Sequence, residues 1–182
     1  MKKIIKHIVK PENGIEAAIV SNANFIEGCS YGKSRPGHPE GAVIYHIKEV
    51  LGNIDKWYSD DEDRKDLRII ALIHDSFKNK VNRNKPKTGE NHHGMIARRF
   101  AQKYVNNYGL CKVIELHDEA YNAWNKGARR GDWYGAERRA KLLIDQLVEI
   151  GRLELYLKFY RCDNATGDKE QENYDWFVKL TN

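Results

Sequence analysis

The sequence predicts an all-α protein, and three features of the 182-residue chain support this fold class. Apolar residues recur every three or four positions, the spacing that places side chains on one face of a helix. Strand-like alternation of apolar and polar residues is nearly absent from the sequence. Hydrophobic residues make up 41% of the chain, which is enough for one domain with a core but not for a second independent domain. We therefore expect a single bundle of about seven helices.

Charge and cysteine content restrict the class of protein further. The formal net charge of +5 favours contact with anions, but it is a mild excess and only weak evidence for nucleic acid as a partner. The three cysteines are far apart and odd in number, which argues against a disulfide framework or a structural zinc site. No apolar stretch approaches the ~18 residues of a membrane span. We expect a soluble, cytoplasmic protein without membrane contact.

The N-terminal third of the chain is expected to contain two helices and an ordered loop. Residues 1–14 fit a short strand or a helical turn, and the apolar spacing of residues 15–28 predicts a helix that ends at a glycine. Residues 30–41 contain three glycines and two prolines, so they form a loop whose prolines give it a defined structure. The pattern of residues 40–54 predicts a helix with His46 on its apolar face.

The central element is the helix expected over residues 67–78. His74 continues its apolar stripe, and Asp75 follows directly. Because neighbouring helical residues lie about 100° apart, both side chains can reach one point only if that point is central, such as a bound cation. The alternative is a histidine and a carboxylate that satisfy each other or cap a neighbouring helix. The acidic run before it, residues 59–66, fits a solvated loop that leads into the first helical turn, where negative charge is favourable.

The second half of the chain is expected to be mainly helical as well. A long polar loop at residues 79–91 precedes helices over residues 91–108, 110–117, 135–150 and 153–163, and a short helix at 174–178 closes the chain. The basic stretch 122–133 reads as another loop. Residues 164–182 form a C-terminal segment whose aromatic residues can dock on the core or on a partner, which leaves a homo-oligomer open.

Several of the expected helices bring a metal-competent side chain to an inward position. These side chains are His46, His74 with Asp75, His93 or His92, His117 and Asp163. Buried ionisable groups are costly unless they are paired or bound to metal, so their coincidence favours a metal site over separate structural roles. His93 is preferred to His92 because it shares the apolar stripe of its helix. Imidazole with carboxylate suits zinc, iron, manganese, nickel or cobalt.

The order of these residues resembles a known family. His, then His-Asp, then two further His and a final Asp is similar to the signature of the HD-domain metal-dependent phosphohydrolases, a helical superfamily, over residues from about 34 to 165. The run Gly37-His38-Pro39-Glu40-Gly41, followed by His46, looks like the opening of the HD domain in some bacterial tRNA nucleotidyltransferases, although the nucleotidyltransferase head is absent. The run His74-Asp75-x-x-Lys78 is similar to the frequent HDxxK motif. The resemblance implies one HD-type domain over residues 1–182, on which residues 1–30 pack as an extension.

The resemblance also implies roles for individual residues. It implies that His46, His74, Asp75 and Asp163 hold a first divalent transition metal, and that His93 and His117 hold a second ion with Asp75 as a bridge, so one or two ions are expected. Asp75 and Lys78 are the catalytic candidates around a metal-activated water that attacks a phosphoester, with Lys78 as an electrostatic partner of the phosphate. The alternative for Lys78 is a surface lysine at a helix end, where the dipole favours it. Candidates for substrate contact are Lys33, Arg35, His38, Arg98 and Lys169. Each of these five also has a plainer interpretation as a solvated or loop-organising side chain.

Three functions follow from this interpretation. The first is a phosphomonoesterase or phosphodiesterase that acts on a small phosphorylated molecule, with a nucleotide as the leading candidate. The second is a diiron oxygenase, because the same family includes oxygenases that use the same histidines and aspartates. The third is a non-catalytic nucleic-acid-binding or regulatory module, in which basic residues 126–130 lie between Trp124 and Trp133 as stacking surfaces.

Overall fold

The computed structural model describes residues 2–182, and this part of the chain folds into helices without a strand. The helices are α1 (Lys2–Val9), α2 (Gly14–Ser21), α3 (Ala23–Cys29), α4 (Val43–Trp57), α5 (Arg64–Ile73), α6 (His93–Ala101), α7 (Tyr108–Leu116), α8 (Glu119–Arg130), α9 (Trp133–Glu149), α10 (Leu153–Asn164) and α11 (Glu172–Thr181), with short 3-10 helices η1 (Lys78–Lys80) and η2 (Gly89–Asn91). The all-α prediction is confirmed, but the helices outnumber the roughly seven expected. None of the described helices combines the length and apolar character that a membrane crossing needs.

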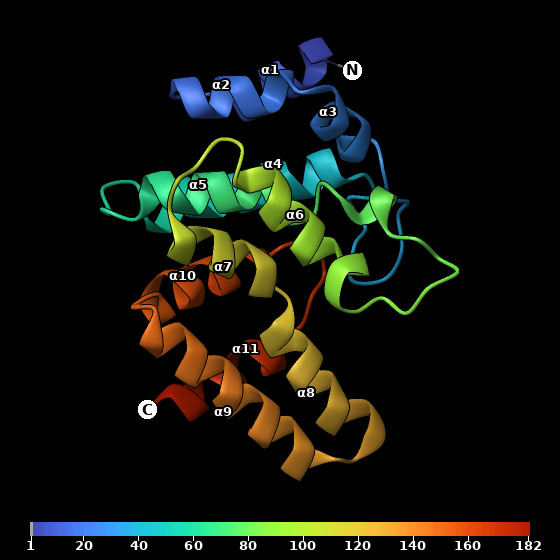
Figure 1. Ribbon diagram of the computed structural model, residues 1–182, viewed down its shortest axis with the longest axis vertical. Coiled ribbons are helices and arrows are strands. Elements are labelled where there is room, and N and C mark those ends of the chain that lie inside the picture. Colours follow the sequence, from blue (N-terminus) through green and yellow to red (C-terminus); the bar gives the residue numbers. More distant parts are fainter. Residues whose placement is uncertain (1) are drawn as a thin grey trace.

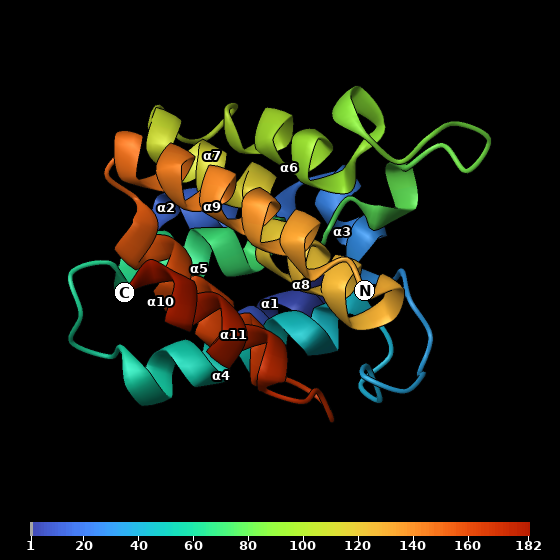
Figure 2. The same cartoon turned by 90° about the horizontal axis from the view of Figure 1, so that it is seen from below.

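From α1 to α9 the chain proceeds along the long axis of the molecule (Figure 1). Helices α1 to α3 lie at one end, and α4 and α5 pack beneath them. The α6–α7 pair contacts α5, and the α8–α9 hairpin forms the opposite end. Helix α10 contacts both α4 and α5, and α11 packs on the hairpin (Figure 2). The chain therefore returns to its centre after building the far end.

Helix α5 is the buried centre of this arrangement. Every residue from 67 to 73 is buried, as expected of a helix that is covered on all sides. Arg68 is the one charged residue in this stretch, and its guanidinium binds the fully buried carboxylate of Glu16 at 2.9 and 3.0 Å. This ion pair fixes α2 to the helix that leads into His74, which explains how a buried arginine is tolerated.

The N-terminal region contains more helices than its apolar pattern indicated. Residues 15–28 form two helices rather than one, because Asn22 takes an extended conformation with φ −74° and ψ 133°. The Asn22 side chain accepts a hydrogen bond from the N–H of Asn24, which caps α3. Of the two alternatives for residues 1–14, the structure shows the helical one, as α1.

The prediction of a loop at residues 122–133 was wrong, because most of this stretch belongs to α8. The buried residues of α8 are Ala120, Ala123 and Gly127, which pack against α9. A Cβ atom on Gly127 would lie 2.2 Å from the ring of Trp133. Small residues give a weak apolar signal, so the stretch reads from sequence as polar and basic. Trp133 contacts Gly127 on one side and lies beside Trp176, with ring centroids 6.0 Å apart, while 43% of its surface stays exposed.

Candidate metal centre

Four side chains form what we call the first cluster: His46 of α4, His74 and Asp75 directly after α5, and Asp163 of α10. The Nε2 atoms of His46 and His74 are 3.1 Å apart. Asp163 Oδ1 lies 2.9 Å from His46 Nε2 and 3.9 Å from His74 Nε2. Asp75 Oδ2 lies 3.9 and 3.7 Å from the same two nitrogens. Three helices thus bring two imidazoles and two carboxylates around one point.

Asp75 also belongs to a second cluster, with His93 and His117. His93 is the first residue of α6, and His117 follows the last residue of α7. Their Nε2 atoms are 3.1 Å apart, and Asp75 Oδ1 lies 3.6 Å from the first and 3.4 Å from the second. The two oxygens of Asp75 therefore face different clusters, while the Lys78 ammonium donates a hydrogen bond to Oδ2.

Hydrogen bonds at Nδ1 determine which imidazole nitrogens are free. His74 Nδ1–H donates to two carbonyl oxygens of α5 at 3.0 and 3.2 Å, and His117 Nδ1–H donates to a carbonyl of α7 at 2.8 Å. His46 Nδ1 lies 3.5 Å from Glu40 Oε1 and 3.3 Å from Thr166 Oγ1. A neutral imidazole protonated at Nδ1 presents a lone pair at Nε2. Both clusters thus combine lone pairs with carboxylate oxygens, a donor set that fits a divalent transition metal.

Burial and charge set the protonation of these groups. Burial lowers the pKa of His74 to about 3, and it also lowers the pKa of His93, so both imidazoles are held neutral, the form that binds metal. Burial alone would raise the pKa of Asp75, but the Lys78 ammonium holds it well below the ordinary value. Burial alone would lower the pKa of Lys78, and the Asp75 carboxylate raises it instead. The Asp75–Lys78 pair is therefore ionised. Burial alone would also lower the pKa of His46 and His117, but Asp163 and Glu40 beside His46, and Asp75 beside His117, raise it instead.

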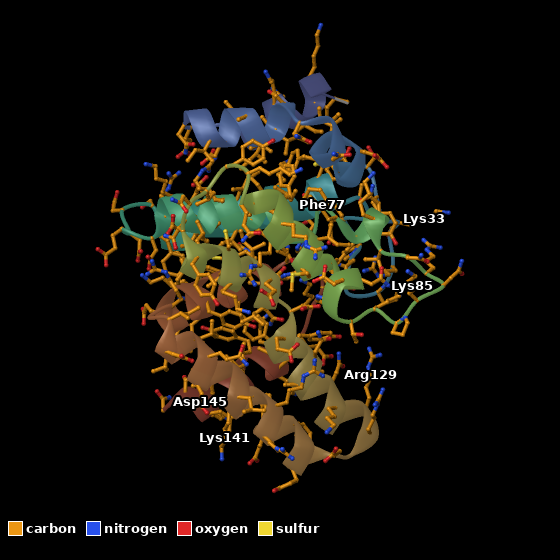
Figure 3. The ribbon with its side chains drawn as sticks, in the orientation of Figure 1. Lys33, Phe77, Lys85, Arg129, Lys141 and Asp145 are labelled. Carbon is orange, nitrogen blue, oxygen red and sulfur yellow. The ribbon has the colours of Figure 1, made fainter. Side chains whose placement is uncertain are left out.

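A cleft of about 1120 Å³ gives access to the second cluster. His93 lines its inner end, and the loops at residues 30–41 and 79–91 form much of its wall. Lys33 marks the first of these loops and Lys85 the second (Figure 3). The first cluster borders a separate pocket of only about 30 Å³, room for roughly one water. A substrate larger than water therefore reaches the centre from the side of the second cluster.

The predicted substrate-contact residues lie in three different surroundings. Lys33 and Arg35 line the cleft. His38 borders the small pocket and donates from Nδ1 to Glu40 at 2.8 Å, while Lys169 Nζ lies 2.9 Å from the Asp163 carbonyl oxygen and 3.3 Å from its Oδ1. Arg98 forms an ion pair with Glu115 and does not appear among the described residues that line the cleft.

Sequence reasoning missed two kinds of residue in this region. Glu40 and Thr166 contact His46 on its Nδ1 side, and only tertiary packing brings them there. Arg83 and Lys87, in the loop at residues 79–91, also line the cleft. The composition of that loop did not indicate which of its side chains would face the cleft. Asp118 follows His117 directly, so a second His-Asp pair was visible in the sequence without an assigned role.

Comparison with known families identifies the type of domain. A model of the HD domain matches residues 43–150, a range that contains His46, His74, Asp75, His93 and His117. The chain belongs to the HD domain family. The matched HD region ends before Asp163, which α10 adds to the first cluster. No curated protein and no solved structure matches the chain.

Proposed function

We propose that this HD domain protein is a metal-dependent phosphohydrolase, a phosphomonoesterase or phosphodiesterase that acts on a nucleotide or another small phosphorylated molecule. The observation that carries the proposal is a histidine–carboxylate centre at the inner end of a cleft with a cationic outer wall. The cationic residues of that wall are Lys33, Arg35, Arg83 and Lys87. Among the described residues no carboxylate forms an ion pair with these four, so their charges are available to an anionic ligand.

The residues of the centre and of the cleft would have different roles in such a reaction. A divalent cation bound there supplies a Lewis acid for phosphoryl oxygens and lowers the pKa of a water molecule that it binds. Asp75 belongs to both clusters, and Lys78 keeps it ionised and in place. The cationic wall holds the parts of the substrate that do not react, which places the reacting phosphate at the second cluster. No nucleophilic side chain is required.

Chelator-stripped protein reloaded separately with manganese, iron, cobalt, nickel or zinc tests this proposal. We expect one or two bound ions per chain by elemental analysis, and metal-dependent hydrolysis of p-nitrophenyl phosphate, its bis ester or members of a nucleotide panel. Asp75→Asn should lower kcat at least about 100-fold, since its carboxylate contacts both clusters. Asp145→Asn, an exposed position on α9 far from the cleft, serves as the matched control (Figure 3).

Two outcomes of the substrate screen would contradict the proposal, and so would one outcome for the variants. One is a metal-loaded protein that hydrolyses none of these substrates. The other is iron-dependent oxygen uptake with an organic diol in place of hydrolysis, which would favour an oxygenase. Equal activity of Asp75→Asn and Asp145→Asn would show that the histidine–carboxylate centre takes no part in the reaction.

A further inference from the structure

Three carboxylates line the cleft, those of Glu115, Asp118 and Glu119. Among the described residues, two of them form an ion pair with an arginine, and Asp118 does not. Glu115 pairs with Arg98, and Glu119 pairs with Arg139. Among the described residues, the ion pairs of Asp118 are with histidines alone: its Oδ2 lies 3.3 Å from His92 Nε2 and 3.7 Å from His93 Nε2. Its Oδ1 is buried and has no hydrogen-bond partner within residues 2–182. The Asp118 side chain is 23% exposed to the cleft, but a buried carboxylate oxygen without a donor is costly unless a cation satisfies it.

His92 shows how this carboxylate is held. The N–H of Gly94 donates to His92 Nδ1 at 3.2 Å, which caps the first turn of α6. Because Nδ1 accepts a hydrogen bond, a neutral His92 carries its proton on Nε2, where it faces Asp118. A metal at His92 Nε2 would need a lone pair at that position. His92 is therefore a hydrogen-bond donor that orients Asp118, and His93 is the better placed of the two to bind an ion.

The position of Asp118 relative to the second cluster fits a ligand. Its Oδ2 is 3.7 Å from His93 Nε2, and Asp75 Oδ1 is 3.6 Å from the same nitrogen. Atoms bonded to one transition metal at ~2.1 Å are separated by roughly 3 to 4 Å. Asp163 lies 2.9 and 3.9 Å from the two histidine nitrogens of the first cluster, whereas Asp118 approaches the second cluster through His93.

We propose that Asp118 is a metal ligand of the second cluster and that His92 is its positioning residue. The second cluster then has two imidazoles and two carboxylates, the same donor set as the first, with Asp75 shared. Three carboxylates neutralise more of the charge of two divalent ions than two carboxylates do. They also favour manganese or iron over metals that prefer softer ligands. This inference rests on the proposed metal-dependent function and specifies the ion that lies closest to the cleft.

Titration of metal-free protein with Mn²⁺, followed by calorimetry and by the EPR signal of free Mn²⁺, tests the inference without any substrate. We expect the wild type to bind two equivalents. Asp118→Asn should weaken one of the two equivalents, the ion of the second cluster, at least about 10-fold and leave the other within twofold. Glu119→Gln is the matched control, because it removes the next carboxylate along the chain from the same cleft and should leave both affinities unchanged.

A second variant separates positioning from folding. His92→Asn retains an oxygen that can cap α6 but is too short to hold Asp118, so it should weaken the same equivalent by less than Asp118→Asn does. Retention of the other equivalent, the ion of the first cluster, shows that each variant is folded. If the wild type binds two ions and Asp118→Asn binds both with unchanged affinity, the inference is overturned and the proposed function stands. A wild type that binds no Mn²⁺ or other transition metal overturns the proposed function itself.

Discussion

At the scale of single residues, two lysines on one loop give a sharp test of the cationic wall. Lys87 lines the cleft, whereas Lys85 does not, although both are exposed and two positions apart. We expect Lys87→Ala to raise KM for a phosphorylated substrate about fivefold, equivalent to ~1 kcal/mol, and Lys85→Ala to change it less than twofold. Steady-state kinetics at low ionic strength measures both. The difference should shrink as salt is added, because exposed charges are screened; equal effects of the two variants would show that only net charge matters.

Residue types and spacing predicted which side chains could serve a metal, but not their mutual geometry. The pattern placed His46, His74, His117 and Asp163 on inward faces, and the structure brings them into two clusters that share Asp75. The apolar stripe favoured His93 over His92, and the hydrogen bond that His92 Nδ1 accepts from Gly94, which only a folded backbone provides, supports that preference.

At the scale of elements, the contact between α3 and the turn after α5 depends on a glycine. A Cβ atom on Gly28 would lie 1.7 Å from the carbonyl oxygen of Ser76, the residue that follows Asp75. We expect Gly28→Ala to lower the free energy of unfolding by about 3 kcal/mol, because this backbone must shift. Gly52→Ala in α4 is the control, since nothing lies within 4 Å of its Cβ and alanine favours a helix by about 1 kcal/mol. Urea denaturation measures both, and equal stability of the two variants would contradict the close contact.

Elements with large apolar residues were predictable, and elements held by small residues or caps were not. The apolar stripe located α5, although the expected helix ran to residue 78 and α5 ends at Ile73. The small residues Ala120, Ala123 and Gly127 gave no such signal for α8, which lies in a basic stretch. The break at Asn22 depends on a side chain that can cap one helix as the previous helix ends. Asparagine does this in one context and sits in a helix in another, so its residue type alone does not locate the break.

At the scale of the whole molecule, a bound ion would join helices that are distant in sequence. The two clusters take their side chains from α4 and α10 and from the ends of α5, α6 and α7. Metal at 100 times its Kd should stabilise the fold by about 2.7 kcal/mol, which raises Tm by roughly 5 to 10 °C for a chain of this size. Calorimetry with and without chelator measures the shift, and Asp75→Asn should reduce it. Identical Tm values for stripped and reloaded wild type would show that metal does not stabilise this fold.

The spread of the ligands along the chain has a consequence for biosynthesis. The second cluster is drawn from the interval between Asp75 and His117, whereas the first spans His46 to Asp163. A chain that leaves the ribosome from its N-terminus exposes every side chain of the second cluster before α9 and α10 have been made. Closing the longer interval also costs more entropy. We therefore expect metallation to be ordered in time: the ion beside the cleft can enter the nascent protein first, and the inner ion waits for α10 to dock.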